Sequence, residues 1–272
     1  MQVHTRRTAL AGAIRGLAEL VRYRELVVNL VVRDLKLRYR HSVLGFLWCL
    51  LNPLLMMTVF TVVFTVMLPD NRIERYPIFI LVGILAWQLH QTALMGAIHS
   101  VVANAHLVQK VYFPREVLPI SVVLANTVNF LLALLVIFPI IFIEGGTLTG
   151  TLAFLPLVVL NQVIFTLGVA LFLAAINVFY RDTGIIMETV IQAWFFLTPI
   201  LYRIEDLLPS YARAMYILNP PASFIASYRD ILYYGGMTNL DFFLRTSATS
   251  VVVLVVGYLC FRSASRHFSE AL

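Results

Sequence analysis

The sequence predicts an all-α integral membrane protein with six transmembrane helices, an N-terminal amphipathic interface helix and two short outer re-entrant helices between spans five and six. Of its 272 residues, 60% are hydrophobic and only 12% are charged, whereas soluble globular domains carry about 25% charged residues. Long apolar runs recur along the chain, and lysine and arginine gather on alternate connections between them. An ordinary soluble domain is therefore excluded.

Six apolar runs are long enough to cross a bilayer as helices, which takes about 20 residues each. We expect the spans at about 43–68, 76–103, 117–143, 152–179, 184–202 and 242–261. Pro53, Pro139 and Pro199 interrupt spans one, three and five. Each proline removes one helix hydrogen bond and should bend its helix, and bent helices can enclose a space.

The distribution of basic residues predicts the orientation, because cytoplasmic segments retain lysine and arginine. With the N-terminus inside, 14 basic residues fall on the cytoplasmic side and six on the outer side, and nine of the 14 lie in residues 1–42. Both termini are then cytoplasmic. We divide the chain into a cytoplasmic N-terminal segment (1–42), a transmembrane domain (43–263) and a cytoplasmic tail (264–272).

The N-terminal segment has helical periodicity. Its polar residues recur every three or four positions from 22 to 40, and apolar residues occupy the other faces, as in an amphipathic helix. Basic residues near an anionic leaflet contribute about 1 kcal/mol each, so we expect this helix in the membrane interface. The alternative is a solvated linker with accidental periodicity. The interface residues are Arg22, Arg33, Asp34, Lys36 and Arg40.

Two connections differ from plain loops. Residues 104–116 form a short cytoplasmic segment that keeps helical character through Tyr112, before Pro114 stops it. Residues 203–240 form a long outer segment, rich in leucine and tyrosine, with the breaker Asn219-Pro220-Pro221 inside it. This composition predicts two short helices that re-enter or line the outer interface, where protein or water must satisfy their ends.

Common catalytic motifs are absent from the sequence. It contains no G-x-x-x-x-G-K-[ST], so any ATP must be bound by a partner, and no H-E-x-x-H, G-x-S-x-G or C-x-x-C. Cys49 and Cys260 both lie in apolar runs, which excludes a disulfide framework and argues against a metal cluster. The basic residues behind the net charge of +6 lie mainly in the predicted cytoplasmic segments, so we expect no nucleic-acid partner.

Three polar residues stand inside predicted spans. His90 and His99 lie nine residues apart in span two, two and a half helical turns, and therefore on opposite faces. Glu188 lies about 9 Å into span five, where a carboxylate should face protein or a wet cavity rather than lipid. Each has two open interpretations: a polar group in a transport pathway, or a hydrogen bond between helices.

Aromatic residues are dense in spans one and five. Their ring faces can stack on the C–H faces of sugars, and they are candidates to line a channel; the alternative is lipid contact or interfacial anchoring. The eight residues are Phe46, Trp48, Phe60, Phe64, Trp194, Phe195, Phe196 and Tyr202.

Five stretches together resemble one known family. The sequence RDLKLRYRHSVLGFLWCLLNPLL (33–55) resembles the entry to the first span of ABC-2-type exporter permeases, in the branch that exports polysaccharides such as O-antigen, capsule, teichoic acid or galactan. Four further stretches resemble the same family in the same order: VQKVYFPREVLPIS (108–121), NVFYRD (177–182), WFFLTPILY (194–202) and NPPASFIASYRDILYYG (219–235).

The resemblance implies a transport subunit rather than an enzyme. Two copies would join two copies of a separate ATPase subunit, which binds ATP and Mg²⁺. They would move an undecaprenyl-linked glycan across the bacterial inner membrane through a channel between the two permease copies, lined by spans one and five. Residues 104–113 would be a coupling helix, and 203–236 would gate the outer opening. The implied ATPase-contacting residues are His106, Leu107, Val108, Gln109, Lys110, Val111 and Tyr112.

Other functions remain open. An ABC-2 permease for a drug or a small lipid would share this architecture. A membrane-embedded transferase acting on a lipid-linked sugar would work without ATP and would depend on His90, His99 or Glu188. A passive channel has little support, since it would not need a helical cytoplasmic connection.

Overall fold

The computed structural model describes residues 22–40, 44–67 and 73–272, and every regular element in these ranges is helical. The all-α prediction is confirmed. The longer helices are α2 (Arg24–Tyr39), α3 (Trp48–Val62), α4 (Tyr76–Ala103), α6 (Val117–Leu134), α7 (Ile137–Ile143), α8 (Leu155–Phe179), α9 (Thr183–Leu197), α11 (Pro209–Leu218), α12 (Pro220–Leu232) and α13 (Leu240–Ser265). The shorter elements are η1 (Gly45–Leu47), η2 (Val63–Met67), α5 (Ala105–Lys110), η3 (Gly150–Phe154), α10 (Ile204–Leu207) and α14 (Phe268–Ala271).

Five helical segments of the described chain are long and apolar enough to cross a membrane. They are Trp48–Met67, Tyr76–Ala103, Val117–Ile143, Gly150–Phe179 and Leu240–Ser265. The fifth predicted span is a shorter apolar helix, α9, of 15 residues. The count of six membrane crossings therefore stays a prediction.

Proline residues explain where two helices break. Helix α9 does not bend at Pro199 but ends before it: Thr198, the residue preceding the proline, is extended with ψ 135°, the conformation that a following proline imposes. Likewise α6 ends at Leu134, and α7 begins three residues later with Pro139 in its first turn. In contrast, Pro53 lies inside α3 without ending it.

Helix α4 forms the centre of the bundle. It packs against α6, α8, α3, α9 and α12. In its most apolar stretch of 18 residues, 78% of the residues are buried. In contrast, only 6% of the residues in the equivalent stretch of Trp48–Met67 are buried. The central helices thus form a scaffold, and α3 lies at its edge.

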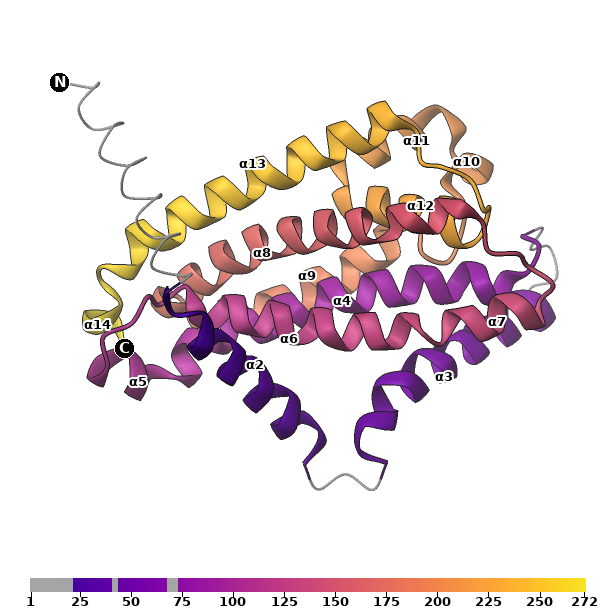
Figure 1. Cartoon of the computed structure of the whole chain (residues 1–272). Coiled ribbons are helices and arrows are strands. Elements are labelled where there is room, and N and C mark those ends of the chain that lie inside the picture. The colour runs from indigo at the N-terminus through magenta and orange to yellow at the C-terminus, as the bar shows by residue number, and fades with distance from the viewer. Residues whose placement is uncertain (1–21, 41–43, 68–72) are drawn as a thin grey trace.

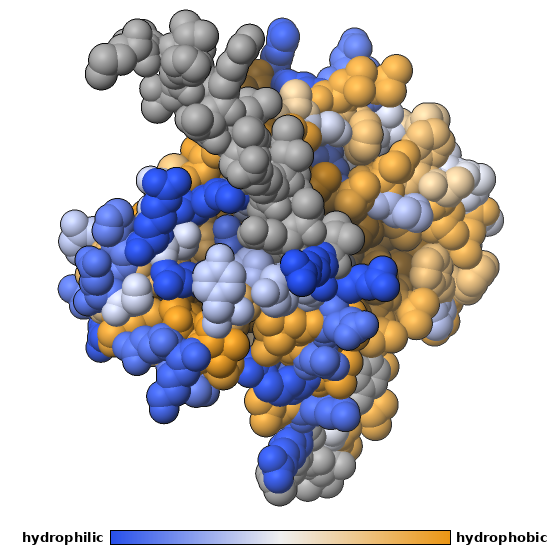
Figure 2. All heavy atoms as spheres, turned by 60° about the vertical axis from the view of Figure 1, so that its left-hand side comes forward, coloured by the Kyte–Doolittle hydropathy of each residue, from blue (hydrophilic) through white to orange (hydrophobic). Residues whose placement is uncertain are grey.

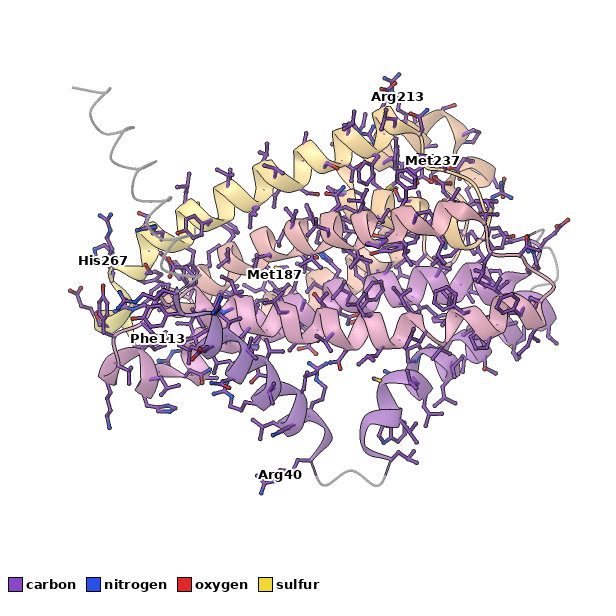
Figure 3. The ribbon with its side chains drawn as sticks, viewed as in Figure 1. Arg40, Phe113, Met187, Arg213, Met237 and His267 are labelled. Carbon is purple, nitrogen blue, oxygen red and sulfur yellow. The ribbon has the colours of Figure 1, made fainter. Side chains whose placement is uncertain are left out.

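Short helices cap both ends of the bundle (Figure 1). Helices α5 and α14 lie together with the C-terminus at one end, and α10, α11 and α12 lie at the other. Helices α2 and α3 leave the side of the bundle at separate points and converge away from it as the two arms of a V, with Arg40 at the far end of the α2 arm (Figure 3). The predicted coupling segment and the predicted outer helices therefore lie at opposite ends.

Candidate functional site

The predicted coupling segment is one short helix followed by a short non-helical segment. Helix α5 covers Ala105–Lys110, and Val111 caps it with a backbone hydrogen bond to Leu107. Val108 is buried in an apolar cluster with Phe261 and Phe268, so it anchors the helix and cannot contact a partner. Tyr112 is 92% exposed. The other exposed coupling residues are His106, Gln109, Lys110 and Val111.

A basic cavity of about 690 Å³ surrounds this segment. Figure 2 shows hydrophilic side chains gathered over the same end of the molecule. Among the described residues that line the cavity, Glu116 is the one acid. The basic lining residues are Arg22, Lys110, Arg115, Arg262 and Arg266. This arrangement favours a partner surface that carries negative charge.

The C-terminal segment, expected only to be a tail, packs against the coupling segment. Arg115 donates a hydrogen bond to the Ser265 carbonyl, and its guanidinium lies 5.9 Å from the centre of the Phe268 ring. Phe268 is fully buried, in edge contact with Phe261 at 5.4 Å. Phe261 belongs to α13 and Phe268 to α14, so no periodicity within a single helix predicts their contact.

Helix α2 is less clearly amphipathic than the periodicity predicts, because Val32 and Leu37 are exposed and Arg33 is not. Leu30 is 6% exposed and packs in the same apolar cluster as Val108. Arg33 is half-buried; it donates to Asn104 Oδ1 at 3.3 Å and pairs with Asp34 at 3.0 Å. It therefore ties α2 to the start of α5 rather than only facing lipid headgroups. The other predicted interface residues, Arg22, Lys36 and Arg40, are exposed.

The candidate channel aromatics divide into two groups. Trp48 is 46% exposed and Phe196 is 61% exposed. Phe60 instead packs on Phe195, with ring centres 6.4 Å apart, and Phe64 packs on Tyr76 at 5.8 Å. Phe60 and Phe195 therefore hold α3 against α9. The side chain of Phe46 lies outside the described residues.

Trp194 and Tyr202 are engaged within the chain. The Trp194 indole N–H donates to Asn219 Oδ1 at 3.0 Å, and its ring meets that of His90 edge-on at 5.2 Å. The Tyr202 hydroxyl donates to the Phe196 carbonyl at 3.2 Å. These contacts link α9 to α4 and to the outer helices, and they leave less of Trp194 for a channel surface than the sequence predicts.

The two histidines lie on different faces of α4, as their spacing predicts. His90 is 1% exposed, and its Nδ1 is 3.0 Å from Thr166 Oγ1 of α8, a hydrogen bond between helices. Its Nε2 is buried and has no hydrogen-bond partner among the described residues, so both interpretations of His90 stay open. His99 is exposed and faces Gly184, where an added Cβ would lie 2.5 Å from the imidazole. Glycine at 184 therefore lets α9 begin close to α4.

Glu188 is exposed on a surface of α9 that mixes polar and apolar side chains. Gln192 and Phe196 follow at intervals of four residues and are also exposed, so the three share one face. Among the described residues, no salt bridge involves Glu188. No three His, Cys, Asp or Glu side chains of the described chain group together in a way that could hold a metal ion.

At the outer end, a buried arginine joins three elements. Arg229 of α12 is 6% exposed and donates to the carbonyls of Pro199 and Ile200 at 2.7 and 2.6 Å. Its guanidinium lies 3.4 Å from the centre of the Phe79 ring of α4. Sequence reasoning counted Arg229 only as an outer charge. Its role depends on residues 29 to 150 positions away, which no local pattern reveals.

A second outer contact ties α11 to α10. The Tyr216 hydroxyl donates to Glu205 Oε1 at 2.8 Å, and burial, together with this hydrogen bond, raises the pKa of Tyr216. The tyrosine is therefore a neutral donor at all physiological pH values. The outer helices are thus anchored to each other and, through Arg229, to α4.

Comparison with known proteins agrees with this architecture. Residues 25–233 match the ABC-2 type transporter family. The chain is 39% identical, over 260 residues, to the O-antigen export system permease protein RfbA of Myxococcus xanthus, covering 95% of this chain and all of that protein. It is 34% identical, over 249 residues, to the RfbA permease of Klebsiella pneumoniae, covering 91% of this chain and 95% of that protein. The chain therefore belongs to the ABC-2 type transporter family, as a multi-pass membrane protein with the architecture of a permease subunit.

Proposed function

We propose that the chain is the permease subunit of an ATP-driven exporter that moves an O-antigen-like, undecaprenyl-linked polysaccharide across the bacterial inner membrane. The observation that carries this proposal is the match, over 91–95% of the chain, to permeases of O-antigen export systems. The chain's own surfaces support the same function at three places.

The first support is the exposed face of α9. Placing a charged residue at the centre of a membrane helix against lipid costs roughly 2.5–3.5 kcal/mol on insertion scales. Glu188 avoids such a cost if it faces a water-filled path or a second copy of the chain. Since α3 and α9 are joined through Phe60 and Phe195, two copies meeting along these helices would enclose a channel with Trp48 and Phe196 on its surface.

The second support is the cytoplasmic end. Tyr112 projects from a rigid base, because Val108 and Phe268 fix α5 and α14 in the bundle. A separate ATPase subunit, binding ATP and Mg²⁺, would receive this projection in a groove. Movement of α5 would reach the membrane helices through Arg33 and Asn104 and through the contact of His99 with Gly184.

The third support is the outer end. Helices α10, α11 and α12 lie at the opposite end of the bundle from α5 (Figure 1), so they would lie on the outer side if α5 faces the cytoplasm. Arg229 links α12 to the end of α9. A shift of α9 would therefore move the outer helices, as a gate over the channel requires.

Depletion of the protein in its native host tests the proposal. Long lipid-linked polysaccharide should accumulate on the cytoplasmic face of the inner membrane, detectable by antibody or lectin access in oriented vesicles. Unchanged polysaccharide on the cell surface would contradict polysaccharide export and favour a drug or lipid permease. Accumulation of short, unextended lipid-linked precursors would instead identify a transferase.

A further inference from the structure

A second cluster of buried apolar side chains lies at the end of the bundle that carries α5 and α14 (Figure 1). It receives buried residues from α2, α4, α5, α6, α8, α13 and α14, and we call it the Phe268 cluster. Helices α3 and α9 contribute no described residue to it and pack instead on the larger cluster around α4. Of the predicted spans, those left out are therefore the two proposed to line the channel.

Helix α5 depends on the Phe268 cluster for its position. It has six residues, and isolated helices shorter than about 12–15 residues are marginal in water. Its buried side chain is that of Val108, 5% exposed. The next buried apolar residues along the chain, Val117 and Leu118 at the start of α6, lie in the same cluster. The exposed Tyr112 is thus held between two attachments to the Phe268 cluster.

Phe268 joins this cluster to the ends of two membrane helices. Its ring centre lies 5.4 Å from that of Phe261 in α13 and 5.9 Å from that of Phe179, the last residue of α8. The Arg115 guanidinium lies 5.9 Å from the same ring centre, and Arg115 also donates to the Ser265 carbonyl. Helix α14 itself packs against α5 and α8. One buried side chain therefore connects the coupling segment with α8 and α13.

These contacts decide what a displacement of the coupling segment moves. Packed protein interiors have low compressibility and transmit strain. With Phe268 in place, a push on α5 reaches the ends of α8 and α13. With a cavity in its place, α5 could shift without moving either helix.

We propose that Phe268 is a positioning residue of the transport cycle, which holds the coupling segment against α8 and α13 so that these elements move as one body. Helices α3 and α9, outside the Phe268 cluster, would shift relative to this body. The role in transport rests on the proposed function, whereas the attachment of α5 through Phe268 does not.

The reactivity of a single cysteine in α5 tests the attachment. The purified full chain, with Cys49 and Cys260 replaced by serine, is placed in lipid nanodiscs, and Val108→Cys reports detachment of α5 by reacting with a hydrophilic thiol reagent. Adding Phe268→Ala should raise the reaction rate about a hundredfold or more, the factor that truncating a core phenylalanine supplies. Phe268→Leu keeps most of the apolar volume and should restore most of the protection.

A matched control separates this attachment from general stability. Phe224 is 1% exposed in α12, at the opposite end of the bundle, and belongs to the larger cluster. Phe224→Ala removes the same side chain and should leave the rate at Val108→Cys unchanged. Equal acceleration by Phe224→Ala and Phe268→Ala would overturn the proposal.

A second pair of variants serves if Phe268→Ala fails to fold by gel filtration. Arg115→Gln removes the hydrogen bond to Ser265 and the contact with the Phe268 ring, and should raise the rate at Val108→Cys about tenfold. Arg266→Gln removes an exposed charge nearby and should not. Equal rates in the two variants would contradict the attachment.

The role in transport has its own measurement, in vesicles that contain the chain together with its ATPase subunit. Phe268→Ala should keep ATP hydrolysis while export falls, so that the ATP consumed per exported polymer rises several-fold, and Phe268→Leu should reverse most of this rise. A proportional loss of hydrolysis and export would overturn the positioning role. Absence of export by the wild type would contradict the proposed function alone, because the cysteine assay contains no ATPase and measures no export.

Discussion

Helices α9 and α13 both lie at the edge of the bundle, but only α9 carries polar side chains midway along its exposed surface. Helix α9 buries only Thr183, Gly184 and Ile191. Its exposed polar residues, Glu188, Thr189 and Gln192, stand among exposed apolar ones, Ile185, Ile186, Val190, Phe196 and Leu197. Helix α13 buries four residues. The exposed positions of its central part are Val251, Val252, Val255, Val256 and Leu259. Burial within one chain does not distinguish lipid from channel, but the polarity of the exposed face does.

The two helices are also attached differently. Helix α13 meets α8 backbone to backbone, since a Cβ at Gly257 would lie 2.0 Å from the Gly168 carbonyl oxygen. Small residues permit such close packing in membranes, where van der Waals contact drives helix association. Helix α9 is held by side chains, through Phe195 against Phe60 and Trp194 against His90. Side chains can repack, so α9 is the better suited of the two to move.

Lysine substitutions should show the largest difference in stability between the two helices. Val252→Lys on α13 should destabilise the membrane-inserted protein by about 3 kcal/mol, because the charge would face lipid. Gln192→Lys on α9 should cost far less, because the charge would face water or a second copy. Thermal unfolding in lipid nanodiscs measures both. Equal losses of stability would show that α9 faces lipid as α13 does.

Glycine substitutions should have the next largest effect. Gly257→Ala should destabilise the protein by about 2 kcal/mol, since backbone atoms of α8 cannot yield and the helices must separate. Gly184→Ala should cost less, because the obstructing atoms belong to the exposed His99 side chain. Gly150→Ala is the control, since no atom lies within 4 Å of its added Cβ. The same unfolding assay measures the loss of stability in all three variants. A loss for Gly184→Ala as large as that for Gly257→Ala would contradict a movable α9.

Glu188→Gln should have the smallest effect on stability. The side chain is exposed and makes no salt bridge with the described residues, so the melting temperature should not change. Export should nevertheless fall several-fold if the carboxylate lines the transport path. Val256→Leu on the lipid-facing side of α13 is the matched control and should leave export unchanged. Normal export by Glu188→Gln would remove this residue from the path.

Patterns of hydropathy and charge predicted most of the fold, because span length and helical periodicity are local properties. Helices α2 and α5 lie within the predicted ranges. The outer segment, expected to form two short helices, forms three, α10, α11 and α12, and their re-entrant character stays a prediction. The length of α9 was overestimated, since Leu201 and Tyr202 continue an apolar run that Pro199 has already ended as a helix. Apolarity alone does not distinguish a helix from a buried extended segment.

The site was less predictable because its contacts are long-range. The carbonyls that Arg229 binds belong to Pro199 and Ile200, and no spacing rule connects them. The burial of Phe268 against α5 likewise depends on tertiary packing. The aromatic list, drawn from composition, could not separate Phe196, which is exposed, from Trp194, which is held inside the chain.

The accessibility of single cysteines to water in intact membranes tests directly whether a water-filled channel runs along α9. After Cys49 and Cys260 are replaced by serine, Gln192→Cys on α9 and Val252→Cys on α13 are each treated with a membrane-impermeant thiol reagent, with the buried Ile191→Cys as control. We expect the Gln192→Cys protein to react while the Val252→Cys and Ile191→Cys proteins stay unmodified. Reaction of the Val252→Cys protein as fast as that of the Gln192→Cys protein, or protection of both, would contradict a water-filled channel along α9.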